Sequence, residues 1–193
     1  MIIRFLSMIT TCILTLSVAW WGYTYAQEAH LDQEYITAIK RMNTQGMTKY
    51  SDPLAFDPNG AVLREHAAKF LSEYWSKVEF KVMSTARYCE FKDIEQADKT
   101  LKNYLIQSCM LNIFYGSQGM FYPTRQLTKA EALVALIRVK EGKLKELDQE
   151  IRRENYTKRA NELWLSKETD SSSQDRPITR YEMALLLHRS ALQ

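Results

Sequence analysis

The 193-residue chain has little of what enzyme and metal sites are usually built from, with only six glycines, three cysteines and three histidines. The glycines form neither a phosphate-cradling loop nor a Gly-x-Ser-x-Gly turn around a nucleophile. The histidines, His30, His66 and His188, lack the His-x-x-x-His spacing of a metal site. We therefore expect a protein that is not an enzyme, holds no metal and needs no cofactor.

The sequence also lacks blocks of like charge and long stretches that alternate polar and apolar residues. Its 26 basic and 23 acidic residues give a net charge of +3, spread along the chain. A nucleic-acid-binding arm would concentrate basic residues, so we do not expect nucleic acid as a partner. Without period-two alternation, the apolar residues at helical spacing predict an all-α protein.

The first 26 residues carry one basic residue, Arg4, followed by an uncharged apolar run and the small residue Ala26. This order is typical of a secretory signal peptide cleaved after Ala26. The run is also long enough to cross a bilayer, and its tryptophans and tyrosines suit a membrane interface. We expect an exported protein whose residues 1–26 are either a signal peptide or an uncleaved N-terminal anchor.

Of the three cysteines, Cys12 lies in this leader, which leaves Cys89 and Cys109 in the exported part. An oxidising exterior would permit a disulfide between them. The alternative is a pair of buried free thiols, and neither alternative indicates catalysis.

One stretch, residues 119–139, predicts where a helix begins. Thr128 and Glu131 have the spacing of a capping box, in which each side chain binds the backbone amide of the other residue. Ala132, Leu136 and Val139 then follow on one helical face. This face must be buried against another element.

The pattern recurs twice. Thr179 and Glu182 repeat the capping box, and Phe56-Asp57-Pro58 repeats the Phe-x-Pro turn of Phe121-Tyr122-Pro123. A basic residue occupies the same register in all three copies, as Arg64, Lys129 and Arg180. Such repetition predicts units that pack on one another, and we place them at residues 29–80, 88–142 and 143–192.

Each unit is expected to contribute two helices. The predicted helices span residues 32–45, 62–77, 93–107, 128–139 with a charged continuation over 143–153, a segment starting near 155, and 179–191. Tyr156, Ala160, Leu163 and Trp164 are expected to share the buried face of the helix that starts near 155. A polar loop is expected at 171–175.

At these residues the chain resembles the S-layer homology domain, whose repeats carry a Phe-x-Pro turn and a Thr-Arg-Ala-Glu helix start. Residues 129–131 and 180–182 match that motif, and residues 91–94 resemble the Phe-x-Asp-Val opening of such a repeat. The first copy matches the motif only at Arg64. The resemblance covers residues 29–192 and implies three helix-pair repeats in a pseudo-threefold bundle, with the motif helices central and grooves between neighbours.

The resemblance also implies a ligand, an anionic and often pyruvylated secondary cell-wall polysaccharide that the motif's basic residue contacts. The candidate ligand-binding residues are therefore Arg64, Lys129 and Arg180. From the residues themselves, a cation in the first turn of a helix favours an anion nearby, because the helix dipole is positive there. Candidates for stacking on sugar rings are Phe56, Tyr122 and Trp164, although such aromatic residues also fill cores.

Two functions remain open from the sequence. The first is a non-catalytic module that attaches to secondary cell-wall polysaccharide, or to another peptidoglycan-linked glycan, at the bacterial cell surface. The second is a membrane-anchored interaction protein whose helical repeats bind another envelope protein.

Overall fold

The computed structural model describes residues 32–79, 88–142, 152–166 and 172–193. Within them the protein is all-α, as predicted, and the extended backbone there forms isolated bridges but no strand. The helices are α2 (Gln33–Thr44), α3 (Arg64–Tyr74), α4 (Lys102–Met110), α5 (Lys129–Glu141), α6 (Arg152–Glu162) and α7 (Arg180–Ser190). The leader and the predicted helical continuation over 143–151 lie outside the described residues.

The predicted helix starts are present. Thr128 and Glu131 form both hydrogen bonds of a capping box at α5, and Thr179 and Glu182 form the same pair at α7. Helix α3 follows Leu63, which offers no side-chain cap. The two capped starts are thus determined by side chains three residues apart, which is why the sequence alone reveals them.

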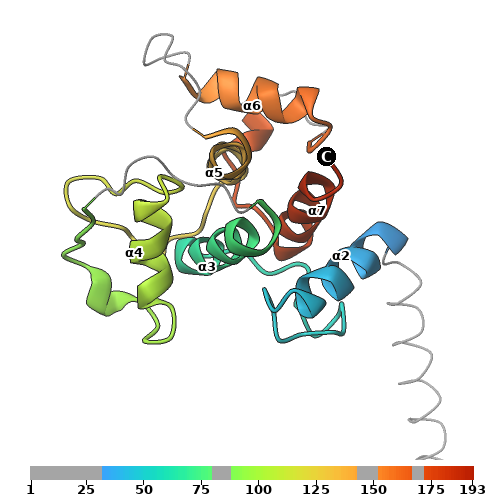
Figure 1. Cartoon of the computed structure of the whole chain (residues 1–193), viewed down its shortest axis with the longest axis horizontal. Helices are drawn as coiled ribbons and strands as arrows, with labels where there is room; N and C mark the ends of the chain where they lie inside the picture. Colours follow the sequence, from blue (N-terminus) through green and yellow to red (C-terminus); the bar gives the residue numbers. More distant parts are fainter. Residues whose placement is uncertain (1–31, 80–87, 143–151, 167–171) are drawn as a thin grey trace, which may run out of the picture.

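Of the α-helices in the described ranges, three are inner and three are outer. Figure 1 shows α3, α5 and α7 at the centre, with α2, α4 and α6 around them. The closest packing joins α3 with α4, α5 with α6, and α7 with α2. Each inner helix therefore packs most extensively against the outer helix of the following copy, with α7 returning to the first copy.

The turns before the inner helices are joined in a closed cycle of backbone hydrogen bonds. The Val62 amide donates to the Ile178 carbonyl (3.0 Å), the Ile178 amide to the Leu127 carbonyl (2.9 Å), and the Leu127 amide to the Val62 carbonyl (2.8 Å). Each of these residues stands two positions before its helix, and all three are fully buried. The cycle brings the three inner helix starts together at one end of the core.

Two predicted helices begin later than expected. The helix predicted at 93–107 starts at Lys102, after a short 3-10 turn at Ile94–Gln96. Asp93 is used elsewhere, because its carboxylate accepts hydrogen bonds from the Phe121 and Tyr122 amides and so braces the Phe-x-Pro turn. The helix predicted at 62–77 starts at Arg64 because Val62 takes part in the backbone cycle, and it changes to π-helical geometry at Trp75–Glu79.

A disulfide joins Cys89 to Cys109 of α4, so the alternative of two free thiols does not apply. It fastens the start of the second copy to an outer helix, and Cys109 is buried. Within the described ranges, no helix has the length and apolar character needed to cross a membrane.

Candidate functional site

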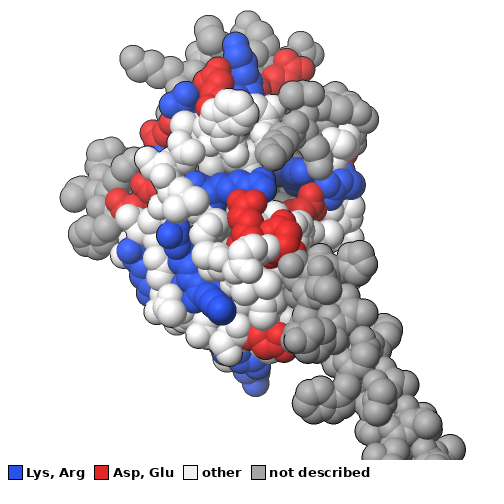
Figure 2. Space-filling view, turned by 90° about the vertical axis from the view of Figure 1, so that its right-hand side faces the viewer, with Lys and Arg blue, Asp and Glu red and all other residues white. Residues whose placement is uncertain are grey.

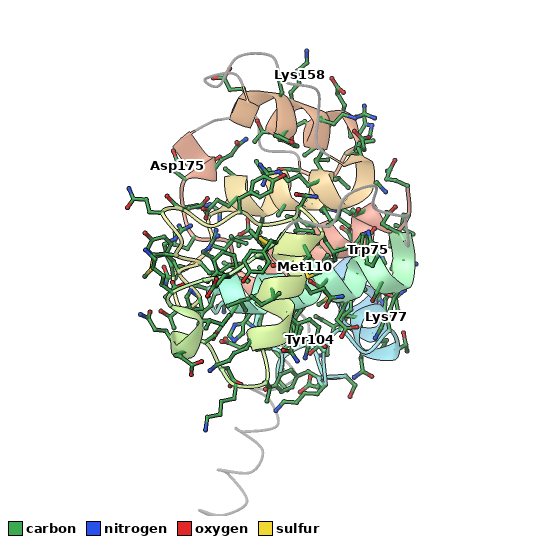
Figure 3. All side chains as sticks on the ribbon, turned by 60° about the vertical axis from the view of Figure 1, so that its left-hand side comes forward. Trp75, Lys77, Tyr104, Met110, Lys158 and Asp175 are labelled. Carbon is green, nitrogen blue, oxygen red and sulfur yellow. A yellow bond between two sulfur atoms is a disulfide. The ribbon has the colours of Figure 1, made fainter. Side chains whose placement is uncertain are left out.

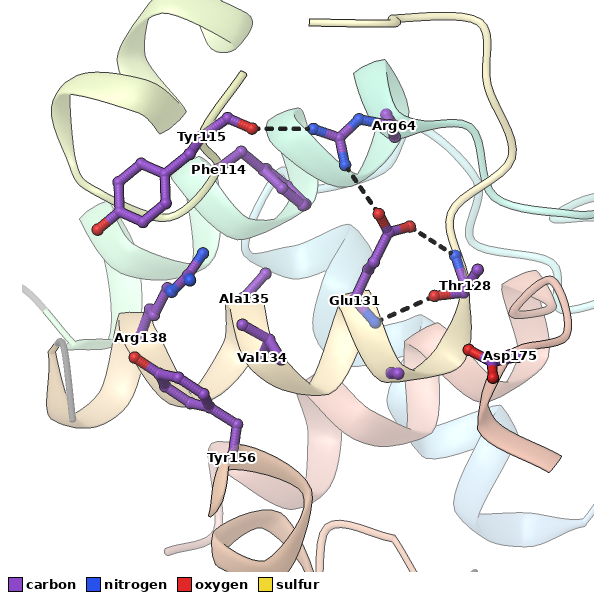
Figure 4. Close-up of a pocket in the computed structure, with 11 residues that line it drawn as sticks. Arg64, Phe114, Tyr115, Thr128, Glu131, Val134, Ala135, Arg138, Tyr156 and Asp175 are labelled. Carbon is purple, nitrogen blue, oxygen red and sulfur yellow. Dashed lines mark hydrogen bonds and ion pairs between the residues drawn. The ribbon is translucent and has the colours of Figure 1, made fainter. Parts of the chain in front are cut away.

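The candidate site is a groove over α5 with a volume of about 550 Å³, lined mainly by the second copy, with Arg64 of the first copy and Tyr156 and Asp175 of the third. Helix α5 forms its floor through Val134 and Ala135, and Figure 4 shows the other lining side chains converging from separate parts of the chain. They are Arg64 of α3, Phe114 and Tyr115 of the loop after α4, Glu131 and Arg138 of α5, Tyr156 of α6, and Asp175. The lining therefore combines apolar faces, two arginines and two carboxylates.

Arg64 forms part of the wall and is only 5% exposed. Its Nε donates to the Phe121 carbonyl at 2.9 Å and its Nη2 to the Tyr115 carbonyl at 3.4 Å. Its Nη1 lies 3.4 Å from Glu131 Oε1, and its guanidinium lies 5.0 Å from the Phe114 ring centroid. Most donors of Arg64 are thus engaged within the protein.

Glu131 is one of the two acidic residues that line the groove, the other being Asp175. Burial raises its pKa, but hydrogen bonds from Arg125 and the Thr128 amide, together with the charge of Arg64, outweigh burial and lower the pKa below its ordinary value. The carboxylate is therefore ionised near neutral pH. It can accept hydrogen bonds from a ligand's hydroxyl groups as well as cap α5.

A second hollow of about 240 Å³ adjoins the groove and shares Arg64, Tyr115 and Glu131 with it. Its far side is formed by Tyr122 and Arg125. Tyr122 is 41% exposed. This predicted sugar-stacking residue therefore lies at the edge of the candidate site.

Neither a protein-family model nor a curated protein matches this chain. The arrangement of its own residues is accordingly the basis for assigning a role to the groove. No group of histidine, cysteine, aspartate and glutamate side chains in the described parts of the chain could hold a metal ion.

The structure does not bring the three predicted basic residues into one site. Lys129 is 6% exposed, and its Nζ lies 3.2 Å from Glu182 Oε1. Arg180 lies at the contact with the first copy, where its Nε donates to the Phe56 carbonyl and its guanidinium lies 4.2 Å from the Phe56 ring centroid. Of the three, Arg64 alone lines the groove.

The other two aromatic candidates are not in the groove. Phe56 is fully buried beneath Arg180, so it cannot stack on a sugar and the prediction for it is wrong. Trp164 is 74% exposed, which contradicts its expected place on a buried face. It stands two residues after the end of α6, in the left-handed backbone region (φ 55°), and the next residue, Leu165, is buried instead.

Sequence reasoning missed Tyr115, Arg138 and Tyr156. These residues belong to no motif. They meet only because the loop after α4, helix α5 and helix α6 come together around the groove. A comparison of the capped copies offers one signal, since Arg138 and Arg189 each stand nine residues after the first residue of their helix.

Among the described residues, the face of the molecule that carries α2 and α7 shows no patch of a single charge. Figure 2 shows basic and acidic side chains next to one another on the side that carries α2 and α7. One such pair is Arg189 with Glu34, which joins these two helices at 2.6 Å. Opposite charges here neutralise each other and provide no extended anion-binding surface.

Proposed function

We propose that this protein is a non-catalytic, S-layer-homology-like module that binds an anionic secondary cell-wall polysaccharide, or another peptidoglycan-linked glycan, at the bacterial surface. The groove over α5 is its glycan site. The observation that carries this proposal is the lining of the groove, which combines the aromatic face of Tyr115, two arginines and the ionised carboxylate of Glu131.

Three related repeats are supported by the backbone cycle of Val62, Leu127 and Ile178. Equivalent positions of the three copies make equivalent bonds to their neighbours, which is the relation expected of a pseudo-threefold bundle. Bonds from the first residue of each inner helix follow the same rule: the Arg64 amide donates to the Arg125 carbonyl, and the Lys129 amide to the Arg176 carbonyl.

The groove suits a saccharide for chemical reasons. Sugar rings have apolar faces that pack on aromatic rings, and tyrosine supplies such a surface with a polar end. Hydroxyl groups can donate to Glu131 and accept from arginine donors. An anionic substituent would meet Arg138, and Tyr122 with Arg125 would extend the contact to a neighbouring sugar.

In this proposal the basic residues of the repeats differ in role. Arg64 belongs to the glycan site, while Lys129 and Arg180 hold neighbouring copies together through Glu182 and the Phe56 carbonyl. The second candidate function, binding of another envelope protein, is favoured by two observations: the burial of Lys129 and the exposed Trp164.

The test is retention of the purified full chain on cell-wall sacculi before and after hydrofluoric acid removes their secondary polymer. Val134→Trp places an indole in the groove without changing any charge. Lys158→Trp is the matched control, because Lys158 lies on the exposed surface of α6 (Figure 3) and does not line the groove. Circular dichroism would confirm that both variants are folded.

We expect the wild type and Lys158→Trp to bind untreated sacculi, and Val134→Trp to bind at least about tenfold more weakly because the groove is filled. None should bind acid-treated sacculi. Retention that survives acid treatment, or equal retention of Val134→Trp, would reject the glycan groove and favour a protein partner.

A further inference from the structure

Arg138 is a cation in the groove without a carboxylate partner. Its Nη1 donates to the Ile113 carbonyl at 3.2 Å, whereas its Nε is buried with no acceptor. Among the residues that the structure describes, none forms an ion pair with it. A buried donor without an acceptor is costly, so an incoming anion would gain from pairing with this guanidinium.

The equivalent arginine of the third copy is neutralised. Arg189 Nε and Nη2 lie 2.6 and 2.8 Å from the two carboxylate oxygens of Glu34 on α2. These hydrogen bonds raise the pKa of Arg189 above its ordinary value. Arg138 and Arg189 thus occupy the same register in related helices, but α2 supplies a carboxylate to Arg189, whereas no carboxylate of the described residues pairs with Arg138.

The guanidinium of Arg138 is held between the aromatic rings of Tyr115 and Tyr156. Its guanidinium carbon lies 4.4 Å from the Tyr115 ring centroid and 5.3 Å from that of Tyr156. Figure 4 shows the head between these tyrosines at the end of the groove away from Thr128. Aromatic contacts engage the faces of a guanidinium, so the N–H groups of Nη2, which bind none of the described residues, remain for an anion.

Arg64, the other arginine of the groove, is less suited to an anion. Its three nitrogens all bind protein oxygens, and Glu131 already offsets its charge. In Arg138 only Nη1 is engaged. Arg64 is therefore bound within the wall of the groove, whereas Arg138 can still bind an anion.

We propose that Arg138 is the anion-binding residue of the groove and pairs with the carboxylate of an acidic sugar, whose ring lies against the partly exposed Tyr115. This inference rests on the proposed glycan function and assigns the charge recognition of that site. A phosphate on the polymer would use the same donors, and the experiment distinguishes the two anions.

The test compares two forms of the polymer released from sacculi: the native polymer, and the polymer whose carboxylates have been reduced to alcohols with its phosphates left intact. Binding of the full chain to each is measured by calorimetry for the wild type, Arg138→Gln, Arg138→Lys and Arg189→Gln. Arg189→Gln is the matched control, since it removes the same group at the same register outside the groove.

The wild type and Arg189→Gln should bind the native polymer at least about tenfold more tightly than the reduced polymer, the size expected for a charged hydrogen-bonded pair. Arg138→Gln should bind both forms equally weakly, and Arg138→Lys should recover part of the preference. A tenfold preference that Arg138→Gln retains would overturn the assignment of Arg138. Equal wild-type binding of both forms would overturn the carboxylate and indicate phosphate. Absence of wild-type binding to the native polymer would instead reject the glycan function itself, and with it this inference.

Discussion

Lys129 Nζ, at the start of α5, donates a hydrogen bond to Glu182 Oε1 of α7 across 3.2 Å. Arg64 of α3 meets Glu131 of α5 in the same way at 3.4 Å. The basic residue that opens one inner helix thus contacts the capping-box glutamate of the next. Because this pairing joins copies, we expect mutation at Lys129 to affect stability more than ligand affinity.

Lys129→Ala should lower the free energy of unfolding by about 1–3 kcal/mol, because it removes a buried charged hydrogen bond. The loss stays moderate because Arg176 still binds Glu182 at 2.6 Å. Urea denaturation of the full chain measures it, and exposed Lys158→Ala should change stability by less than about 0.5 kcal/mol. Unchanged stability of Lys129→Ala together with lost sacculus binding would instead make Lys129 a ligand residue.

Stability should fall in acid as Glu182 becomes protonated. Burial raises the pKa of Glu182, but hydrogen bonds from Arg176 and the Thr179 amide and the charge of Lys129 prevail and lower the pKa from 4.5 to about 2. Because the folded pKa is the lower one, the ionised carboxylate stabilises the fold above pH 4.5. This contribution is lost as the pH falls toward 2.

Denaturation curves recorded between pH 2 and 7 would test this prediction. Glu182→Gln should be less stable than the wild type at pH 7, and its stability should depend less steeply on pH below 4.5. Parallel curves for the two proteins would show that Glu182 does not carry the acid sensitivity.

Loss of the disulfide should destabilise the protein by about 3 kcal/mol, since Cys89 and Cys109 close a loop with a sequence separation of 20. The Cys89→Ser, Cys109→Ser double variant should match the reduced wild type in denaturant. Added reductant should leave this variant unchanged. If reductant does not alter the wild type either, the bond contributes nothing to stability in solution.

Trp164→Gly should preserve stability or raise it by up to about 1 kcal/mol, because glycine adopts the observed φ of 55° without strain and the exposed indole loses little packing. Gly46, which follows α2 at φ 68°, provides the converse test. Gly46→Ala should cost about 1 kcal/mol. A loss of about 3 kcal/mol or more in Trp164→Gly would mean that the indole is packed in a core after all.

The local features of this protein could be predicted from sequence because they depend on residues close together in the chain. The capping boxes at Thr128 and Thr179 each need a glutamate three residues on, and helical periodicity needs a single turn. The all-α class and the repeated helix starts follow from such patterns. Helix 93–107 was misplaced because Asp93 is bound by the amides of Phe121 and Tyr122, which are remote in sequence.

The site depended on tertiary structure. The burial of Lys129 is determined by Glu182, 53 residues away, and no local pattern reports that distance. Tyr115, Arg138 and Tyr156 meet because three segments pack around one groove. Within the described ranges no helix presents a carboxylate to Arg138 as α2 does to Arg189. The sequence by itself determined the all-α class and the two capped helix starts, through hydrogen bonds that close within one turn. Only the packing of helices distant in sequence decided that Arg189 pairs with Glu34 while Arg138 binds a backbone carbonyl, because pairing depends on distances that the fold alone sets.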